Sequence, residues 1–274
     1  MASLDLTSLL SDPTKDRILR HSNSGQMPLL AVFDGHGGDR CAEYSSKHLP
    51  QHVAAAVEEA ALRSGGDAEL DVDAVLEEAL KEGFRRTEAD CEQQWREHGE
   101  KSGACACVCV LADRKGGGVM HVANLGDCRA VLGRSETAHR MAAVRLTTDH
   151  RATAPDEMRR IVGAGGQVVD KRALGDLIPS RTLGDFKTKE KCPGAVIAEP
   201  DMSRHELTRD DAFLILASDG LWDDLKVDRV IDIGGRSRTP DAACKSIATA
   251  VIKKYGAKNT KPNDDLTVVA AYFS

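Results

Sequence analysis

The sequence predicts an α+β fold in which helices pack on an antiparallel system of β-strands. Helical patterns are concentrated early and late in the chain, and short apolar or β-branched segments lie between them. Grouping of this kind, in place of a regular alternation of strands and helices, is typical of α+β proteins. No long Pro- or Ser-rich linker and no repeat divides the sequence, so we expect one domain over residues 1–274.

Composition and charge narrow the class of protein. Hydrophobic residues make up 41% and charged residues 29% of the chain, which is ordinary for a globular protein with a sizeable core. The net charge of −6 and the lack of a long basic run argue against nucleic-acid and anionic-membrane binding. There is no apolar span of bilayer length and no secretory pattern. We expect a soluble, cytoplasmic monomer, with a nuclear location left open.

Residues 1–28 form an atypical N-terminal segment with little pattern. Leu6, Leu9 and Leu10 favour a short turn of helix that Pro13 interrupts, and residues 22–25 are typical of a loop. No constellation of catalytic residue types occurs in this segment.

The first strong element is the apolar run at residues 29–33, which predicts a buried strand. It ends at Asp34, followed by Gly35, His36 and two further glycines, which let the backbone approach a ligand closely. A carboxylate and an imidazole beside such a turn suit metal-assisted chemistry on an anion. A tight strand-to-helix turn with an Asp cap explains the isolated motif equally well.

Two helices are expected next. Residues 39–63 have a helical composition and spacing, and Pro50 is expected to kink or split this helix near His48. A second helix is expected from about Asp71 to His98. Its predicted buried stripe consists of apolar residues at steps of four or seven: Val72, Leu76, Leu80, Phe84, Cys91 and Trp95.

From Ser102 onwards the pattern changes to strands. Residues 103–111, 119–123 and 129–132 predict an antiparallel meander. Cys105, Cys107 and Cys109 alternate in the first strand, so their side chains share one face. Because no Cys-x-x-Cys or matching His pair supports a thiolate metal site, we interpret them as small buried residues and expect no disulfides.

The C-terminal half predicts two more helices and two more strands. One helix is opened by Pro155 and closed by Gly163 or Gly165, and residues 166–208 are expected to be irregular. Residues 213–217 predict a buried strand, and residues 268–273 predict the last one. Between them, Thr239 and Pro240 begin a helix. Its predicted buried stripe is Ala243, Ile247, Val251 and Tyr255.

Three acidic turns are associated with strands: Asp34-Gly35, Asp219-Gly220 and Asp264-Asp265. Each alone is more often a cap or a turn residue. If the strands at residues 29–33 and 213–217 are neighbours, their carboxylates meet at one sheet end, where they repel unless cations neutralise them. A site made of oxygen ligands favours Mg or Mn, and a pair of such ions can activate water against a phosphoryl group.

At this point the chain resembles the metal-dependent serine/threonine protein phosphatases of the 2C type. The resemblance covers about residues 29–274 and rests on nine motifs in the family's order. They include Val32-Phe-Asp-Gly-His-Gly-Gly38, Asn124-Leu-Gly-Asp-Cys-Arg129 and Ala217-Ser-Asp-Gly-Leu-Trp-Asp223. The others lie at residues 102–103, 148–150, 157–166, 180–185, 199–201 and 264–267. Each motif is weak alone, but the series is specific.

The resemblance implies a central antiparallel β-sandwich flanked by pairs of helices, in four layers (α-β-β-α). It implies hydrolysis of phosphoserine and phosphothreonine in phosphoproteins at a centre of two Mg or Mn ions, with a variable flap within residues 166–199. A metal-bound hydroxide would attack phosphorus while His36, as general acid, protonates the leaving oxygen.

The resemblance also implies the metal ligands. Asp34 would bridge the two ions, the Gly35 carbonyl would bind one of them, and Asp219 and Asp264 would be carboxylate ligands. Asp127 and Asp223 match positions that can hold a third ion, or are only turn and helix-start residues.

The chain departs from the family in two places. The family usually carries an Arg that grips phosphate, a few residues ahead of a Met-Glu-Asp or Asn-Glu-Asp, and residues 1–28 do not reproduce it. Arg17 and Arg20 lack the acidic partner, and Asp265 stands where the family usually has Asn. The alternatives to a fully active phosphatase are a low-activity enzyme, a fragment without its first strands, and a catalytically impaired pseudophosphatase or regulatory binding module.

Overall fold

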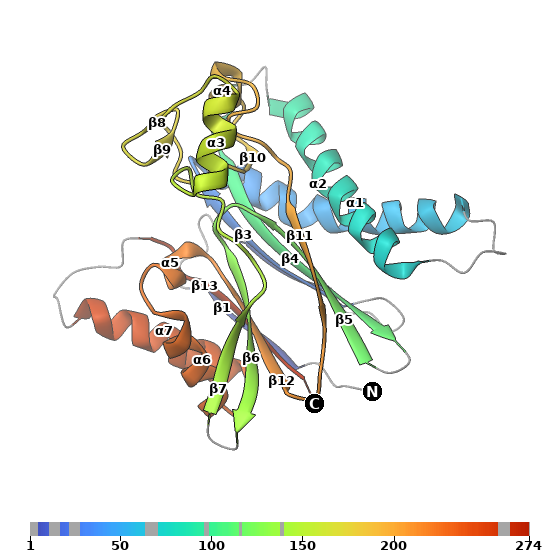
Figure 1. The fold of residues 1–274 in the computed structure, drawn as a ribbon, viewed down its shortest axis with the longest axis vertical. Coiled ribbons are helices and arrows are strands. Elements are labelled where there is room, and N and C mark those ends of the chain that lie inside the picture. The colour runs from blue at the N-terminus through green and yellow to red at the C-terminus, as the bar shows by residue number, and fades with distance from the viewer. Residues whose placement is uncertain are drawn as a thin grey trace.

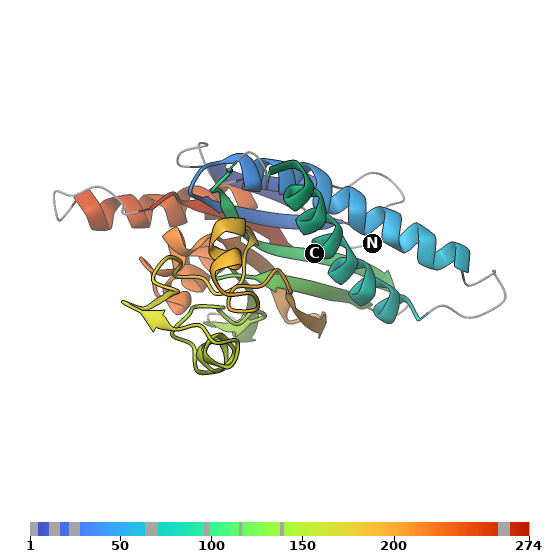
Figure 2. The same cartoon turned by 90° about the horizontal axis from the view of Figure 1, so that it is seen from above.

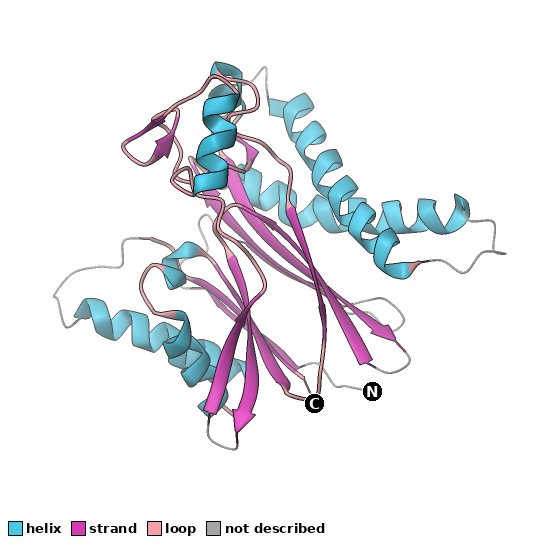
Figure 3. Ribbon diagram, viewed as in Figure 1, coloured by secondary structure: helices cyan, strands magenta, loops and turns pink. Residues whose placement is uncertain are grey.

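Two antiparallel β-sheets lie face to face, and helices cover their outer faces (Figures 1 and 3). The computed structural model describes residues 5–10, 17–21, 28–63, 71–95, 99–114, 117–137, 140–256 and 264–273. Within these ranges the helices and the antiparallel sheets confirm the predicted α+β class. None of the helices in the described ranges is long and apolar enough to cross a membrane.

The first sheet has five strands. Their order is β1 (Asp5–Leu10), β13 (Thr267–Tyr272), β12 (Asp211–Ala217), β6 (Arg129–Thr137) and β7 (Arg140–Arg145). The second sheet has the order β11 (Asp201–Glu206), β5 (Gly117–Leu125), β4 (Gly103–Arg114), β3 (Leu29–His36) and β2 (Arg17–His21), and the short β10 (Leu183–Gly184) also pairs with β4.

The facing sides of the two sheets form the central core. Because side chains alternate along a strand, one face of each strand contributes to this layer. Val32 of β3 and Leu214 and Leu216 of β12 are buried here. The thiols of Cys105, Cys107 and Cys109 lie in the same layer, which confirms them as small buried core residues. All eight cysteines are free, and only Cys192 is partly exposed.

Two pairs of helices cover the outer faces of the sheets. Helices α1 (Arg40–Arg63) and α2 (Val72–Trp95) pack on the sheet that contains β3. Helices α6 (Val227–Arg236) and α7 (Pro240–Gly256) pack on the sheet that contains β12. The predicted stripe of α2 is buried except for Val72 at its first residue, and the whole predicted stripe of α7 is buried.

A third group of elements lies at one end of the sandwich. It contains α3 (Pro155–Gly163), β8 (Val168–Val169) and β9 (Arg172–Ala173) around a small core of their own, and the short α4 (Phe186–Lys191), whose Phe186 packs instead in the core beneath α1 and α2. Figure 2 shows this yellow segment apart from α1 and α7. The one-turn α5 (Asp219–Trp222) follows β12 directly.

Several local predictions are wrong. The expected turn of helix at Leu6 to Leu10 is strand β1, since its backbone pairs with β13, more than 250 residues away. Pro50 was expected to kink or split its helix; the helix runs unbroken from Arg40 to Arg63, so the split does not occur, and the kink stays a prediction. Leu49 and Val53, on either side of the proline, are buried against the core, and this packing outweighs one lost helical hydrogen bond. The predicted loop at residues 22–25 lies outside the described residues.

The connections between strands also differ from the prediction. The expected meander is wrong, because β5 and β6 belong to different sheets. The chain crosses from one sheet to the other at residues 126–128, which places Asp127 between them. Residues 166–208 are not wholly irregular, since β11 adds to the edge of β5.

Candidate metal centre

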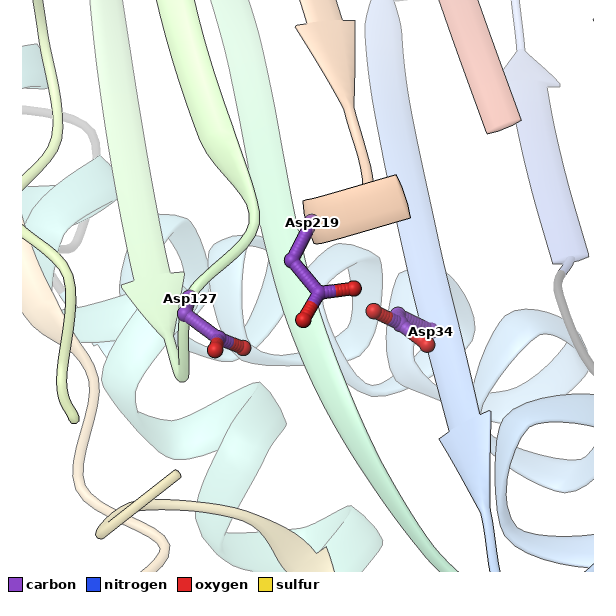
Figure 4. A group of neighbouring side chains, drawn as sticks. All are labelled: Asp34, Asp127 and Asp219. Atoms are coloured by element: carbon purple, nitrogen blue, oxygen red, sulfur yellow. The ribbon is translucent and has the colours of Figure 1, made fainter. Parts of the chain in front are cut away.

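Three carboxylates converge where the two sheets meet at one end (Figure 4). Asp34 lies near the end of β3, Asp127 in the turn from β5 to β6, and Asp219 at the first residue of α5. One ligand oxygen from each lies within 4.8 Å of the others. The strands of Asp34 and Asp219 are not neighbours in one sheet, the condition considered from the sequence, since β3 and β12 lie in facing sheets. The stacking of the sheets brings their ends together instead.

The third acidic turn packs against the second. A Cβ atom on Gly220 would lie 2.1 Å from the carbonyl oxygen of Asp265, so only glycine allows this contact. The Ser218 hydroxyl accepts a hydrogen bond from the Thr267 amide at 3.1 Å and donates one to the Asp265 carbonyl at 3.4 Å. These contacts hold Asp264 in the same cleft as Asp219, although Asp264 lies outside the converging group of three.

The electrostatics of the group favour a bound cation. Burial, with the charges of Asp127, Asp264 and Asp223, raises the pKa of Asp219 to about 7. Burial also raises the pKa of Asp127. Carboxylates this close together repel one another, and a bound cation lowers that electrostatic repulsion. Because every donor in the group is a carboxylate oxygen, the residues fit Mg²⁺ or Mn²⁺.

A guanidinium group already lies within this acidic cluster. Arg151 Nε donates to Asp127 Oδ2 at 2.9 Å, and Arg151 Nη2 lies 2.9 Å from both carboxylate oxygens of Asp223. The same Nη2 atom is 3.5 Å from Asp219 Oδ2. Residue type and spacing gave no signal for Arg151, which follows the motif at residues 148–150.

His36 pairs with a residue whose role the sequence did not indicate. His36 Nε2 lies 2.7 Å from Asp185 Oδ2, and the Asp185 side chain is only 4% exposed. Burial lowers the pKa of His36. The hydrogen bond to Asp185 and the charges of Asp185, Asp127 and Asp219 outweigh that effect, so the pKa is raised overall. Asp185 is the last residue of the motif at residues 180–185, and this was the only feature of the sequence that pointed to a functional role for it.

The cleft around these groups has a volume of about 450 Å³. The predicted site residues that line it are Asp34, Gly35, His36, Asp127, Asp219 and Asp264. Asp223 is not among the lining residues, and it pairs with Arg151. Lys101 and Arg172 add two cations to the lining, and Leu177, Ile178 and Pro179 form an apolar wall.

The buried carboxylate of Glu157 fixes the segment that carries the apolar wall of Leu177, Ile178 and Pro179. Glu157, on α3, is 4% exposed. It accepts hydrogen bonds from Arg160 Nη2 at 2.6 Å, from the Ser180 hydroxyl at 2.5 Å and from Arg181 Nη2 at 2.7 Å. Because Ser180 and Arg181 follow Pro179 directly, this network fixes one end of the wall. The motifs at residues 157–161 and 180–185 therefore meet in space.

The backbone register of β2 shows where Arg17 and Arg20, the two arginines of the N-terminal segment, lie along the sheet. In the register of β2 and β3, Arg17 is opposite Phe33 and Arg20 is opposite Leu30. Arg17 is thus at the end of the sheet where Asp34 lies.

Comparison with known proteins gives consistent matches. The family model described as protein phosphatase 2C matches residues 10–263. The chain is 35% identical to the Arabidopsis thaliana protein named probable protein phosphatase 2C 30, over 88% of this chain and 60% of that protein. It is 33% identical to probable protein phosphatase 2C 67 of Oryza sativa subsp. japonica, over 98% of this chain and 76% of the relative.

A solved structure has the same fold. It is described as a serine-threonine phosphatase 2C from Toxoplasma gondii and matches with a TM-score of 0.82 at 21% identity. The match covers 100% of this chain and 95% of that one. At this level of identity the likeness concerns the fold alone, in agreement with the two-sheet arrangement described above.

Proposed function

The chain belongs to the protein phosphatase 2C family, and on that premise we propose that it hydrolyses phosphoserine and phosphothreonine in phosphoproteins. The observation that carries the proposal is the convergence of Asp34, Asp127 and Asp219 within 4.8 Å, in one cleft with His36. The chain spans 60% and 76% of the two relatives compared above, so the activity is proposed for the cleft of this chain itself.

Divalent cations are the cofactor in this proposal. Asp34 and Asp219, with Asp264 and the Gly35 carbonyl beside them, would hold a pair of Mg or Mn ions. When bound, such ions activate water at neutral pH and neutralise charge on phosphoryl oxygens. The raised pKa values of Asp219 and Asp127 support the proposal, since a bound cation stabilises the ionised form of both groups.

His36 is proposed to complete the reaction as the general acid. Hydrolysis joins a water oxygen to phosphorus and breaks the bond to the Ser or Thr oxygen, which then needs a proton. His36 lines the cleft and is 29% exposed, so its ring can reach a bound substrate. The nearby carboxylates favour its protonated form, which is the form able to donate.

Substrate binding is assigned to the mouth of the cleft. Lys101 and Arg172 place positive charge where a phosphate approaches the acidic floor. Neither forms an ion pair with a residue of the described ranges, although Arg172 Nη1 donates to the Asp176 carbonyl at 2.8 Å, so each cation can still attract an anion. Leu177, Ile178 and Pro179 offer an apolar surface to the peptide that flanks the phosphorylated residue.

The proposal is tested by hydrolysis of a phosphothreonine peptide with added Mn²⁺. We expect metal-dependent turnover that Asp219→Asn abolishes and that Asp210→Asn, at an exposed position before β12, leaves intact. His36→Gln should lower kcat at least about 100-fold while Mn²⁺ affinity, measured by calorimetry, stays nearly unchanged.

The impaired alternative makes a different prediction for the same samples. Mn²⁺ binding without turnover at any metal concentration, in a folded protein, would favour the pseudophosphatase or regulatory module. Its motivation is the phosphate-gripping motif missing from residues 1–28. An equal loss of metal affinity in His36→Gln would contradict the role of His36 as general acid.

A further inference from the structure

Arg151 occupies the space between two carboxylates that lie beside the proposed cation pair. Asp127 is 3% exposed and Asp223 is 51% exposed, and the guanidinium of Arg151 contacts both. Its Nε atom is 2.9 Å from Asp127, and its Nη2 atom is 2.9 Å from each oxygen of Asp223. One planar cation therefore bridges a buried carboxylate and a partly exposed one.

The backbone around Arg151 is fixed on both sides. The His150 amide donates to the Gly126 carbonyl at 2.9 Å, and the Gly126 amide donates to His150 Nδ1 at 3.2 Å. The Ala152 amide donates to the Ile178 carbonyl at 2.9 Å. Because Gly126 precedes Asp127, the arginine and its buried partner are held in one network. The side chain is 26% exposed, so the protein positions this guanidinium more tightly than a solvated surface arginine.

A metal ion between Asp127 and Asp223 would need the space and the oxygens that Arg151 uses. Mg²⁺ and Mn²⁺ bind carboxylate oxygens at roughly 2.0–2.2 Å. Both Asp223 oxygens and one Asp127 oxygen already accept from the guanidinium, and an ion among them would also meet a like charge. In contrast, Arg151 Nη2 approaches Asp219 Oδ2 only to 3.5 Å.

We propose that Arg151 is a built-in cation that takes the place of a metal ion between Asp127 and Asp223, so that ions bind only on the side of Asp34 and Asp219. Arg151 is a positioning residue in this account, since it fixes Asp127 and limits the number of ions in the cleft. The inference rests on the divalent-cation site of the proposed function, but not on turnover.

The test is the number of Mn²⁺ ions bound per chain, measured by calorimetry and by electron paramagnetic resonance of free Mn²⁺. Arg151→Gln should bind one ion more than the wild type, and the double variant Arg151→Gln with Asp223→Asn should return to the wild-type number. Arg134→Gln is the matched control, because it breaks an arginine–carboxylate pair of 2.9 Å with Asp211, away from the cleft. Equal numbers in Arg151→Gln and the wild type would overturn the inference.

The single variant Asp223→Asn gives a second test. The Asp223 side chain is 51% exposed, so this substitution should not disturb the fold. If Arg151 excludes an ion from this position, Asp223→Asn should bind as many ions as the wild type. A decrease by one ion would show that Asp223 is a metal ligand and would overturn the inference. If Arg151→Gln binds Mn²⁺ and the wild type does not, the proposed function is contradicted but the role of Arg151 is not. If neither protein binds Mn²⁺, the proposed function and the role of Arg151 are both contradicted.

Discussion

His36 Nε2 lies 2.7 Å from Asp185 Oδ2, although the two residues are 149 positions apart in the sequence. Asp185 precedes α4 and has a left-handed backbone conformation, with φ of 54°. His36 is the last residue of β3. The pair therefore joins the strand that carries Asp34 to the segment that forms the apolar wall, and it raises the pKa of His36, which favours the protonated imidazole.

Replacing Asp185 should impair the proposed general acid without removing it. Asparagine tolerates the left-handed conformation, so Asp185→Asn keeps the backbone and removes the charge. We expect kcat to fall by up to about 100-fold. The His36 pKa is raised and the acid form exists below that pKa, so kcat is lost as pH rises through it. In Asp185→Asn this loss should occur at lower pH.

The measurement is the pH dependence of kcat for Asp185→Asn beside Asp176→Asn. Asp176 lines the same cleft but pairs with Lys191 instead of His36. An unchanged pH profile in Asp185→Asn would contradict the role assigned to the pair.

Gly103 has no side chain because the His36–Asp185 pair fills its space. A Cβ atom at this position would lie 2.0 Å from Asp185 Oδ2 and 2.5 Å from His36 Nε2. We expect Gly103→Ala to displace the pair and to reduce kcat at least about 100-fold, while the protein remains folded by circular dichroism. Gly163→Ala is the control, since nothing lies within 4 Å of its Cβ position. Similar turnover in the two variants would refute this explanation of the glycine.

Glu157 should contribute to stability in a pH-dependent way. Burial alone raises its pKa, but hydrogen bonds from Arg181, Ser180 and Arg160 outweigh burial and lower the pKa to about 2. The unfolded value is about 4.3. Because the folded pKa is the lower one, its contribution is present above about pH 4.3 and is lost as pH falls towards 2.

Glu157→Gln leaves the two arginines without their buried charge partner and should lower the free energy of unfolding by roughly 3–5 kcal/mol at neutral pH. Urea denaturation between pH 7 and pH 3 measures this, and the difference from the wild type should shrink as pH falls. Glu136→Gln removes an exposed pair with Arg140 and should cost less than about 1 kcal/mol. A cost for Glu157→Gln as small as that of the control would be evidence against the anchor.

Lys101 and Arg172 should affect substrate binding more than the chemical step. Each is exposed, and an exposed charge pair contributes up to about 1 kcal/mol. Lys101→Ala and Arg172→Ala should therefore each raise KM by up to about fivefold, with kcat little changed and the effect weaker at high salt. Lys245→Ala, on the surface of α7 and paired with Asp241, serves as the control. A fall in kcat at constant KM would place these residues in a different role.

The spacing of apolar residues predicted those helices and strands whose formation does not depend on a distant partner strand. The stripe of α7 and the buried strand before Asp34 are examples, because their apolar spacing follows from helix and strand geometry alone. Strand β1 was not predictable in this way. Its leucines fit a turn of helix, and only pairing with β13 makes a strand the more stable state.

The same distinction applies to the site. The acidic turns at Asp34 and Asp219 were predictable because carboxylates directly follow apolar strands, but the stacking of two sheets that brings them together was not. Asp185 and Arg151 received no role from the sequence. Their importance comes from partners 149 and 24 or more positions away, and such contacts exist only once the sheets have stacked.

The most direct test of the central claim is anomalous X-ray diffraction from crystals grown with Mn²⁺. The account predicts Mn²⁺ peaks in the cleft with Asp34 and Asp219 as ligands, and the guanidinium of Arg151 still between Asp127 and Asp223. Well-diffracting crystals at saturating Mn²⁺ without a peak at Asp34 and Asp219, or with the ions bound elsewhere on the protein, would contradict it.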